Sequence, residues 1–119
     1  MLLQTVTPIA VLGTTVLFAL FLSVTAHLAA RNVLGDADPR RALYVGPLPA
    51  VVAVVGGAFA VTPAVTVPLA LALDAAMFAW SYDRDARAAA AMTVLHVVIT
   101  VLLGVVIGGI ALLLGTRPT

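Results

Sequence analysis

The stretch between Arg41 and Asp83 most constrains the fold, because Asp74 is its only charged residue. A single helix of this length would rise about 60 Å, twice the roughly 30 Å hydrocarbon thickness of a bilayer. The stretch must therefore turn back on itself. Thr62-Pro63 is the expected turn, because the residue before a proline disfavours helix. We expect two antiparallel helices here, over residues 42–61 and 64–82, and we expect Gly46-Pro47-Leu48-Pro49 to bend the first of them or delay its start.

Two further apolar stretches flank this hairpin. Residues 7–31 start with Pro8, which suits a first helical turn, and residues 88–114 end before Gly115. Each exceeds the roughly 20 residues that cross a bilayer. Only 9% of the chain is charged, against about a quarter in soluble domains. The sequence predicts one all-α domain over residues 1–119, an integral membrane, antiparallel four-helix transmembrane bundle.

The arginines predict the orientation of this bundle. Five of the six lie in or beside the loops after the first and third helices: Arg31, Arg40, Arg41, Arg84 and Arg87. Short arginine-rich loops face the cytoplasm. We therefore expect both of these loops on the cytoplasmic side of the cell membrane and both termini outside. The arginines are interpreted chiefly as topology signals, with binding of anionic lipid headgroups as the lesser alternative.

Several kinds of chemistry find no support in the sequence. The chain has no cysteine, so thiol redox chemistry and thiolate metal sites are excluded. Two histidines do not complete a structural zinc site, which usually has four ligands. No basic patch is interleaved with aromatic residues, so nucleic-acid binding is not expected. We expect no metal, no cofactor and no catalytic residues.

One pair of ionisable residues lies deep in the apolar segments. Asp74 and His96 are each eleven positions from Asp85, in the loop between the third and fourth helices, so the hairpin brings them to similar depth. Intramembrane ionisable residues are costly and commonly functional. The pair is either a structural hydrogen bond that fixes helix register or a proton relay; Asp74 could also be protonated outright. His27 is a secondary candidate, interpreted as structural or interfacial.

Small residues predict which helix faces pack. In the last helix His96, Thr100, Gly104 and Gly108 recur at steps of four and share one face. Close helix packing in membranes favours such small residues. We expect the Gly104–Gly108 face to contact another helix of the same chain. Comparable faces are expected on the second helix, around Gly56 and Gly57, and on the first, at Thr15, Ala19, Ser23 and His27.

Part of the chain resembles a group of known membrane proteins. The segment containing Thr25-Ala26-His27-Leu28-Ala29-Ala30, Leu34-Gly35-Asp36 and Arg40-Arg41-Ala42 is similar to uncharacterised four-helix membrane proteins of halophilic archaea. The resemblance covers about a quarter of the chain and implies no activity. The size also suits small multidrug resistance transporters. Those proteins depend on a membrane-embedded glutamate, and this chain contains no glutamate.

These observations favour a non-enzymatic accessory or assembly subunit in the membrane. The expected partners are the lipid bilayer and either further copies of the chain or another membrane protein. The alternative is a small proton-coupled transporter or channel that uses Asp74 and His96.

Overall fold

The computed structural model describes residues 7–116, which form five helices. Their bounds are Pro8–Leu34 (α1), Pro39–Ala42 (α2), Pro47–Ala58 (α3), Pro63–Tyr82 (α4) and Ala86–Thr116 (α5). Taking α2 and α3 together, four segments are long and apolar enough to cross a membrane. The expected bounds of the first, third and fourth helices agree with α1, α4 and α5 to within three residues.

Local sequence explains where the helices begin and end. The side chains of Thr7, Asp38 and Asp85 each accept a hydrogen bond from a backbone N–H two or three residues later, at 3.0, 3.0 and 2.9 Å. Such bonds satisfy donors that a helix start leaves without intrahelical partners. At the other ends, α1 stops at Gly35 and α4 at Asp83, both with positive φ. Glycine favours this conformation and aspartate tolerates it.

The second predicted helix, over residues 42–61, is shorter in the structure. Within this range the regular helix is α3, Pro47–Ala58, and residues 43–46 separate it from the short α2, in agreement with the delayed start expected at Gly46-Pro47-Leu48-Pro49. Pro47 and Pro49 explain the division, because prolines are accommodated in the first turn of a helix and disrupt its interior. Gly46 has a second role at this break. A Cβ added to it would lie 2.2 Å from Ser23 Oγ, so only glycine lets the chain pass this close to α1.

Two contacts attach α2 to the end of α4. The Arg41 guanidinium donates to the Ser81 carbonyl, and Ser81 Oγ donates to the Arg41 carbonyl at 2.8 Å. Beside them the rings of Tyr44 and Trp80 meet edge to face, with centroids 5.6 Å apart. The arginine-bearing loop before α3 is thereby held against the end of α4, next to the other arginine-bearing loop.

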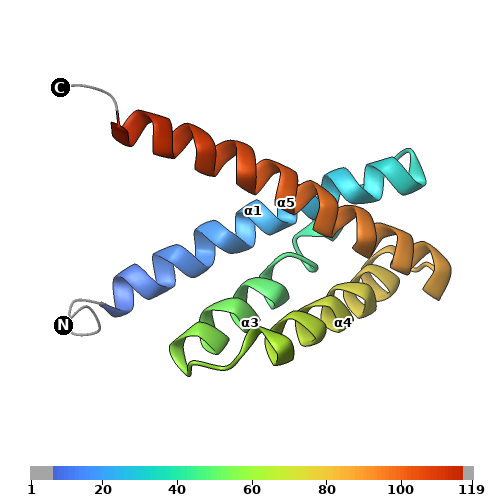
Figure 1. The fold of residues 1–119 in the computed structure, drawn as a ribbon. Helices are drawn as coiled ribbons and strands as arrows, with labels where there is room; N and C mark the ends of the chain where they lie inside the picture. The colour runs from blue at the N-terminus through green and yellow to red at the C-terminus, as the bar shows by residue number, and fades with distance from the viewer. Residues whose placement is uncertain (1–6, 117–119) are drawn as a thin grey trace.

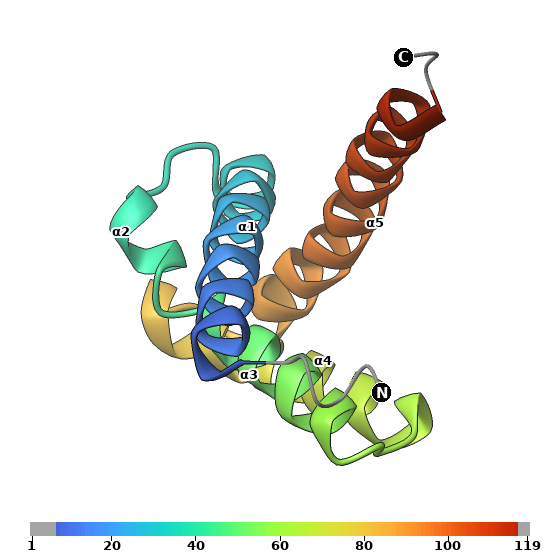
Figure 2. The same cartoon turned by 90° about the vertical axis from the view of Figure 1, so that its left-hand side faces the viewer.

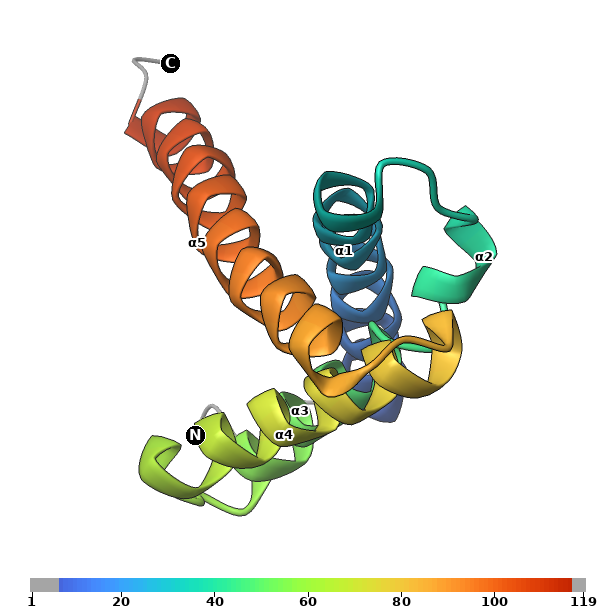
Figure 3. The same cartoon turned by 90° about the vertical axis from the view of Figure 1, so that its right-hand side faces the viewer.

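The helices meet at the arginine-bearing end and diverge toward the other end (Figures 1 and 2). The main core lies at the closed end, where small alanines of α1 pack with Phe78 of α4 and Met92 of α5. Seen from another side, the last half of α5 extends away from the α3–α4 hairpin (Figure 3). The bundle is therefore antiparallel, as expected, but it is packed along only part of its length.

This divergence contradicts the predicted packing of the last helix inside the chain. Gly104 and Gly108 are exposed, and a Cβ added to either would meet no described atom within 4 Å. Gly57 is likewise open, whereas Gly56 packs against the side chain of Thr66 on α4. The sequence pattern identifies a small face but does not say which helix covers it. Within the described residues, none covers Gly104 and Gly108.

Candidate functional site: a buried polar network

The structure brings Asp74 of α4 and His96 of α5 into direct contact. His96 Nδ1 and Asp74 Oδ2 are hydrogen bonded, and the two side chains are only 4% and 5% exposed. Phe78, one helical turn after Asp74, packs edge-on against the imidazole with ring centroids 5.6 Å apart. Counting residues from the hairpin turn predicted that these two side chains lie at the same depth. In the structure α4 and α5 are also rotated so that the two side chains face each other.

A third helix completes the network. His96 Nε2 lies 3.0 Å from the Leu22 carbonyl oxygen and 2.8 Å from Thr25 Oγ1, both on α1. Thr25 Oγ1 donates to the Leu22 carbonyl at 3.0 Å and accepts from Thr100 Oγ1 at 3.1 Å. His96 therefore joins α1, α4 and α5 at the point where all three are packed together.

These contacts constrain where the hydrogens on His96 lie. A carbonyl oxygen can only accept, so the contact with Leu22 places a hydrogen on His96 Nε2. The Thr25 hydroxyl already donates to the same carbonyl and can accept from both His96 and Thr100. On the other side of the ring, one proton must lie between Nδ1 and Asp74 Oδ2, because two lone pairs would repel there.

One polar atom of the network has no partner. Asp74 Oδ1 is buried and accepts no hydrogen bond from the described residues. Asp74 also lines a cavity of about 210 Å³, together with His96 and Thr100. The rest of that cavity is apolar and is formed by all four long helices: Phe18, Leu22, Pro49, Ala53, Ala70, Leu71, Val97 and Val101. It lies on the diverging side of the Asp74–His96 contact.

His27 is not part of this network. Its side chain is half-buried, and among the described residues its Nδ1 atom has no hydrogen-bond partner. It lines a different cavity, beside Ser23 of α1 and Arg40 of α2. The structure therefore separates the two histidines, and His27 does not replace His96 as the partner of Asp74.

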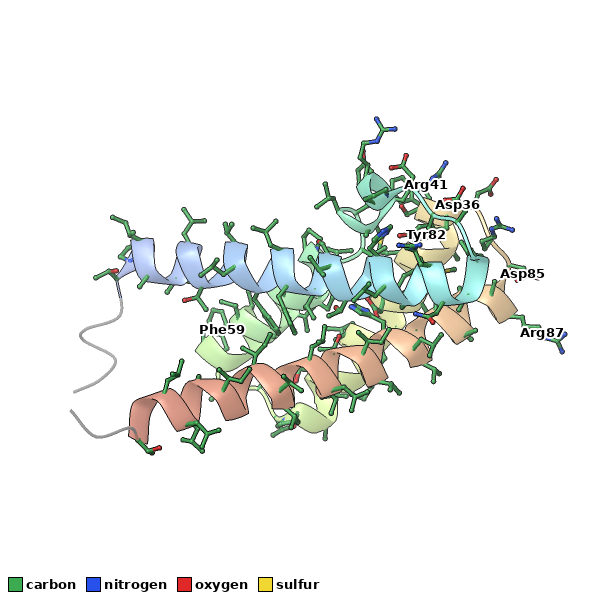
Figure 4. All side chains as sticks on the ribbon, turned by 90° about the horizontal axis from the view of Figure 1, so that it is seen from above. Asp36, Arg41, Phe59, Tyr82, Asp85 and Arg87 are labelled. Carbon is green, nitrogen blue, oxygen red and sulfur yellow. The ribbon has the colours of Figure 1, made fainter. Side chains whose placement is uncertain are left out.

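The five loop arginines gather at the closed end of the bundle but differ in their contacts. Arg40 pairs with Asp38 at 3.0 Å, and this hydrogen-bonded guanidinium lowers the pKa of the Asp38 carboxyl below its ordinary value. Arg41 is bonded to Ser81. The other three are exposed, Arg31, Arg84 and Arg87, and Arg87 points away from the helices (Figure 4).

Sequence reasoning missed most of the α1 side of the network. Thr100 lies on the predicted stripe through His96, so its position was available from the spacing. Thr25 and Leu22 were not identified, since the predicted α1 stripe ran through Ser23 and His27. The buried face of α1 includes Leu22, Thr25, Ala26 and Ala29 in addition to Ser23 of the predicted stripe.

The fold and this network define an all-α protein whose four long apolar segments can each span a membrane. The chain belongs to a family of unknown function, DUF7473, whose model matches residues 5–118. No curated protein and no solved structure matches it. The family assignment brings no activity with it, and these comparisons do not support the resemblance to proteins of halophilic archaea.

Proposed function

We propose that this chain is a non-enzymatic accessory or assembly subunit that binds another membrane protein through the uncovered half of α5. The observation that carries the proposal is the exposure of Gly104 and Gly108 on that half. Glycine lowers helix stability relative to alanine by roughly 0.5–1 kcal/mol. Glycines four residues apart let a second helix approach the backbone closely.

The loops support the same proposal. The connections between helices at the closed end are all short: residues 35–38 between α1 and α2, residues 43–46 between α2 and α3, and residues 83–85 between α4 and α5. The long helices therefore supply nearly all of the surface for specific recognition. We propose that the arginine-bearing end faces the cytoplasm, since positively charged loops are retained there. The chain has no native cysteine, so labelling Asp36→Cys from each side of the membrane tests this orientation.

Replacing Gly104 and Gly108 with bulky residues tests the contact with the partner. Gly104→Ile/Gly108→Ile adds bulk at two exposed positions, where an added Cβ meets no described atom within 4 Å. After gentle extraction from native membranes, we expect the tagged double variant to retain roughly a tenth of the co-purified partner, as expected for a loss of 1–2 kcal/mol.

Gly109→Ile is the matched control, because Gly109 is equally open but lies about 100° around the helix from Gly108. It should retain the partner. Recovery of the unmodified chain only as a monomer, or only with copies of itself, would overturn the accessory role.

A second candidate function is proton-coupled transport through the Asp74–His96 network. The buried hydrogen bond between Asp74 and His96 supports it, because ionisable pairs inside membrane-spanning helices commonly serve as proton relays. In liposomes, proton flux under an applied potential should fall roughly tenfold or more in Asp74→Asn and in His96→Ala. Asp36→Asn, in an exposed loop, is the control. Unchanged flux in both site variants would exclude these roles.

A further inference from the structure

We propose that the closed end of the bundle binds the phosphate group of an anionic membrane lipid, in a hollow between the α2 segment and the end of α4. The hollow has a volume of about 510 Å³. This is several times the roughly 150 Å³ of a cavity that accommodates benzene, so a phosphate with its glycerol group fits. Its walls combine charged and aromatic side chains: Asp38, Arg40, Arg41, Tyr44, Trp80 and Ser81.

Two guanidinium groups supply hydrogen-bond donors to this hollow. The Arg40 side chain is 86% exposed and pairs with Asp38 through Nε and one terminal nitrogen, at 3.2 and 3.0 Å. No described bond uses its other terminal nitrogen. Arg41 donates from one terminal nitrogen to the Ser81 carbonyl, which holds its guanidinium in the wall of the hollow. The planar array of N–H donors on a guanidinium group matches phosphate oxygens, so the two arginines are suited to bind one phosphate.

The charge of the walls favours an anionic lipid over a zwitterionic one. Arg40 and Arg41 against Asp38 give the hollow a net charge of +1. Both carboxylate oxygens of Asp38 are already bonded to Arg40. A lipid with a net negative charge is attracted by the remaining positive charge, whereas the ammonium group of a zwitterionic headgroup is repelled by it.

The aromatic side chains of the hollow match the headgroup layer of a bilayer. Tyr44 and Trp80 are 58% and 65% exposed and meet edge to face. Tyrosine and tryptophan accumulate at the level of lipid headgroups, because each combines an apolar ring with one polar donor. The hollow therefore has the composition of a site at the membrane surface.

An adjoining apolar groove favours a lipid over a free phosphate. This groove has a volume of about 280 Å³ and shares Arg40 with the hollow. Its walls include Leu43 after α2 and extend along α1 through Val24 to Leu20, near the middle of that helix. A phosphate bound at Arg40 thus has an apolar path for an acyl chain that leads from the closed end toward the middle of the bundle.

The test uses the fluorescence of Trp80, which is the only tryptophan of the chain and lines the hollow. The full chain is reconstituted in phosphatidylcholine nanodiscs with increasing fractions of brominated phosphatidylglycerol or brominated phosphatidylcholine. Bromine near the carboxyl end of an acyl chain quenches a neighbouring indole. We expect half-maximal quenching at an about fivefold lower fraction of phosphatidylglycerol, the ratio for one net positive charge beside an anionic lipid. Equal quenching by the two lipids would overturn the proposal.

Charge variants separate this site from a general attraction of anionic lipids to arginine. Arg40→Gln leaves the hollow without net charge, so the preference for phosphatidylglycerol should disappear. Asp38→Asn retains a good N-cap residue and adds one net positive charge, so the preference should rise about fivefold further. Arg87→Gln is the matched control, because Arg87 is exposed at the same end but does not line the hollow. An equal loss in Arg40→Gln and Arg87→Gln, or a lower preference in Asp38→Asn, would overturn the proposal.

Soluble anions distinguish the two sources of phosphate. Inorganic phosphate and glycerophosphoglycerol carry the chemistry of the headgroup but have no acyl chain for the groove. At constant ionic strength, neither should relieve the quenching by brominated phosphatidylglycerol. Relief by either one would indicate a site for a soluble phosphate and would overturn the assignment to a lipid. These measurements leave Gly104, Gly108 and the Asp74–His96 contact unchanged, so their outcome is independent of the accessory and transport roles.

Discussion

His96→Leu is expected to lower the free energy of unfolding by about 2–3 kcal/mol, since it removes the hydrogen-bond partner of Asp74 Oδ2 while Oδ1 is already unpaired. Breaking a buried ion pair in a soluble protein typically costs about 3–5 kcal/mol. The expected loss here is smaller, because in the unfolded reference state Asp74 also stays in the bilayer and finds other partners there.

The double variant Asp74→Leu/His96→Leu makes this prediction specific. Leucine at both positions leaves no buried carboxyl group, while Thr25 still donates to the Leu22 carbonyl. We expect the double variant to regain most of the stability that His96→Leu loses, as apolar replacement of a buried pair often does. Unfolding in bicelles measures both, with the exposed Val94→Leu as control. Additive losses would show that the two side chains are not energetically coupled.

Gly46→Ala is expected to destabilise the fold by about 1–3 kcal/mol, the usual cost of inserting a methyl group into a packed contact. Its Cβ would lie 2.5 Å from the Ser23 backbone nitrogen and 2.7 Å from the Ala19 carbonyl oxygen. These are backbone atoms, so rotation of a side chain cannot relieve the clash, and α1 must separate from the start of α3.

Gly57→Ala is the matched control for Gly46→Ala. It lies in α3, and its added Cβ meets no described atom within 4 Å. This substitution should be neutral or raise stability by up to about 1 kcal/mol, because alanine has less conformational freedom than glycine in the unfolded chain. Thermal unfolding of the two variants in the same detergent distinguishes them. Equal stability would contradict the close contact between Gly46 and α1.

Hydrophobic length and proline positions were sufficient to predict most of the helices. Pro63 determined the turn between α3 and α4, and Pro8 the start of α1, because proline fits the first helical turn. The break between α2 and α3 was predicted only as a bend or delayed start at Gly46-Pro47-Leu48-Pro49. The prolines indicated the break, whereas the close approach of Gly46 to Ser23 of α1, 23 positions earlier in the chain, depends on tertiary packing that the sequence pattern does not reveal.

The depth of Asp74 and His96 along their helices was predictable from the sequence, but the direction in which the side chains of the network face was only partly predictable. Counting from Asp85 placed Asp74 and His96 at one level, since helices rise by a fixed distance per residue. To predict Thr25 as the next partner of His96, one must know which face α1 turns toward the other helices. The hairpin formed by α4 and α5 does not determine this. Gly104 and Gly108 show the same limit, because their spacing defines a face without identifying its neighbour.

The unequal lengths of α3 and α5 relate this fold to bilayer thickness. At 1.5 Å per residue, the 31 residues of α5 rise about 46 Å, whereas the 12 residues of α3 rise about 18 Å. A hydrocarbon layer of about 30 Å matches neither when both stand upright. In the membrane orientation that we propose, tilting would accommodate the long helix, and local thinning of the bilayer or an inward displacement of the turn between α3 and α4 would accommodate the short one. The angle at which α5 leaves the hairpin would then couple the open end of the bundle to the thickness of the surrounding lipid.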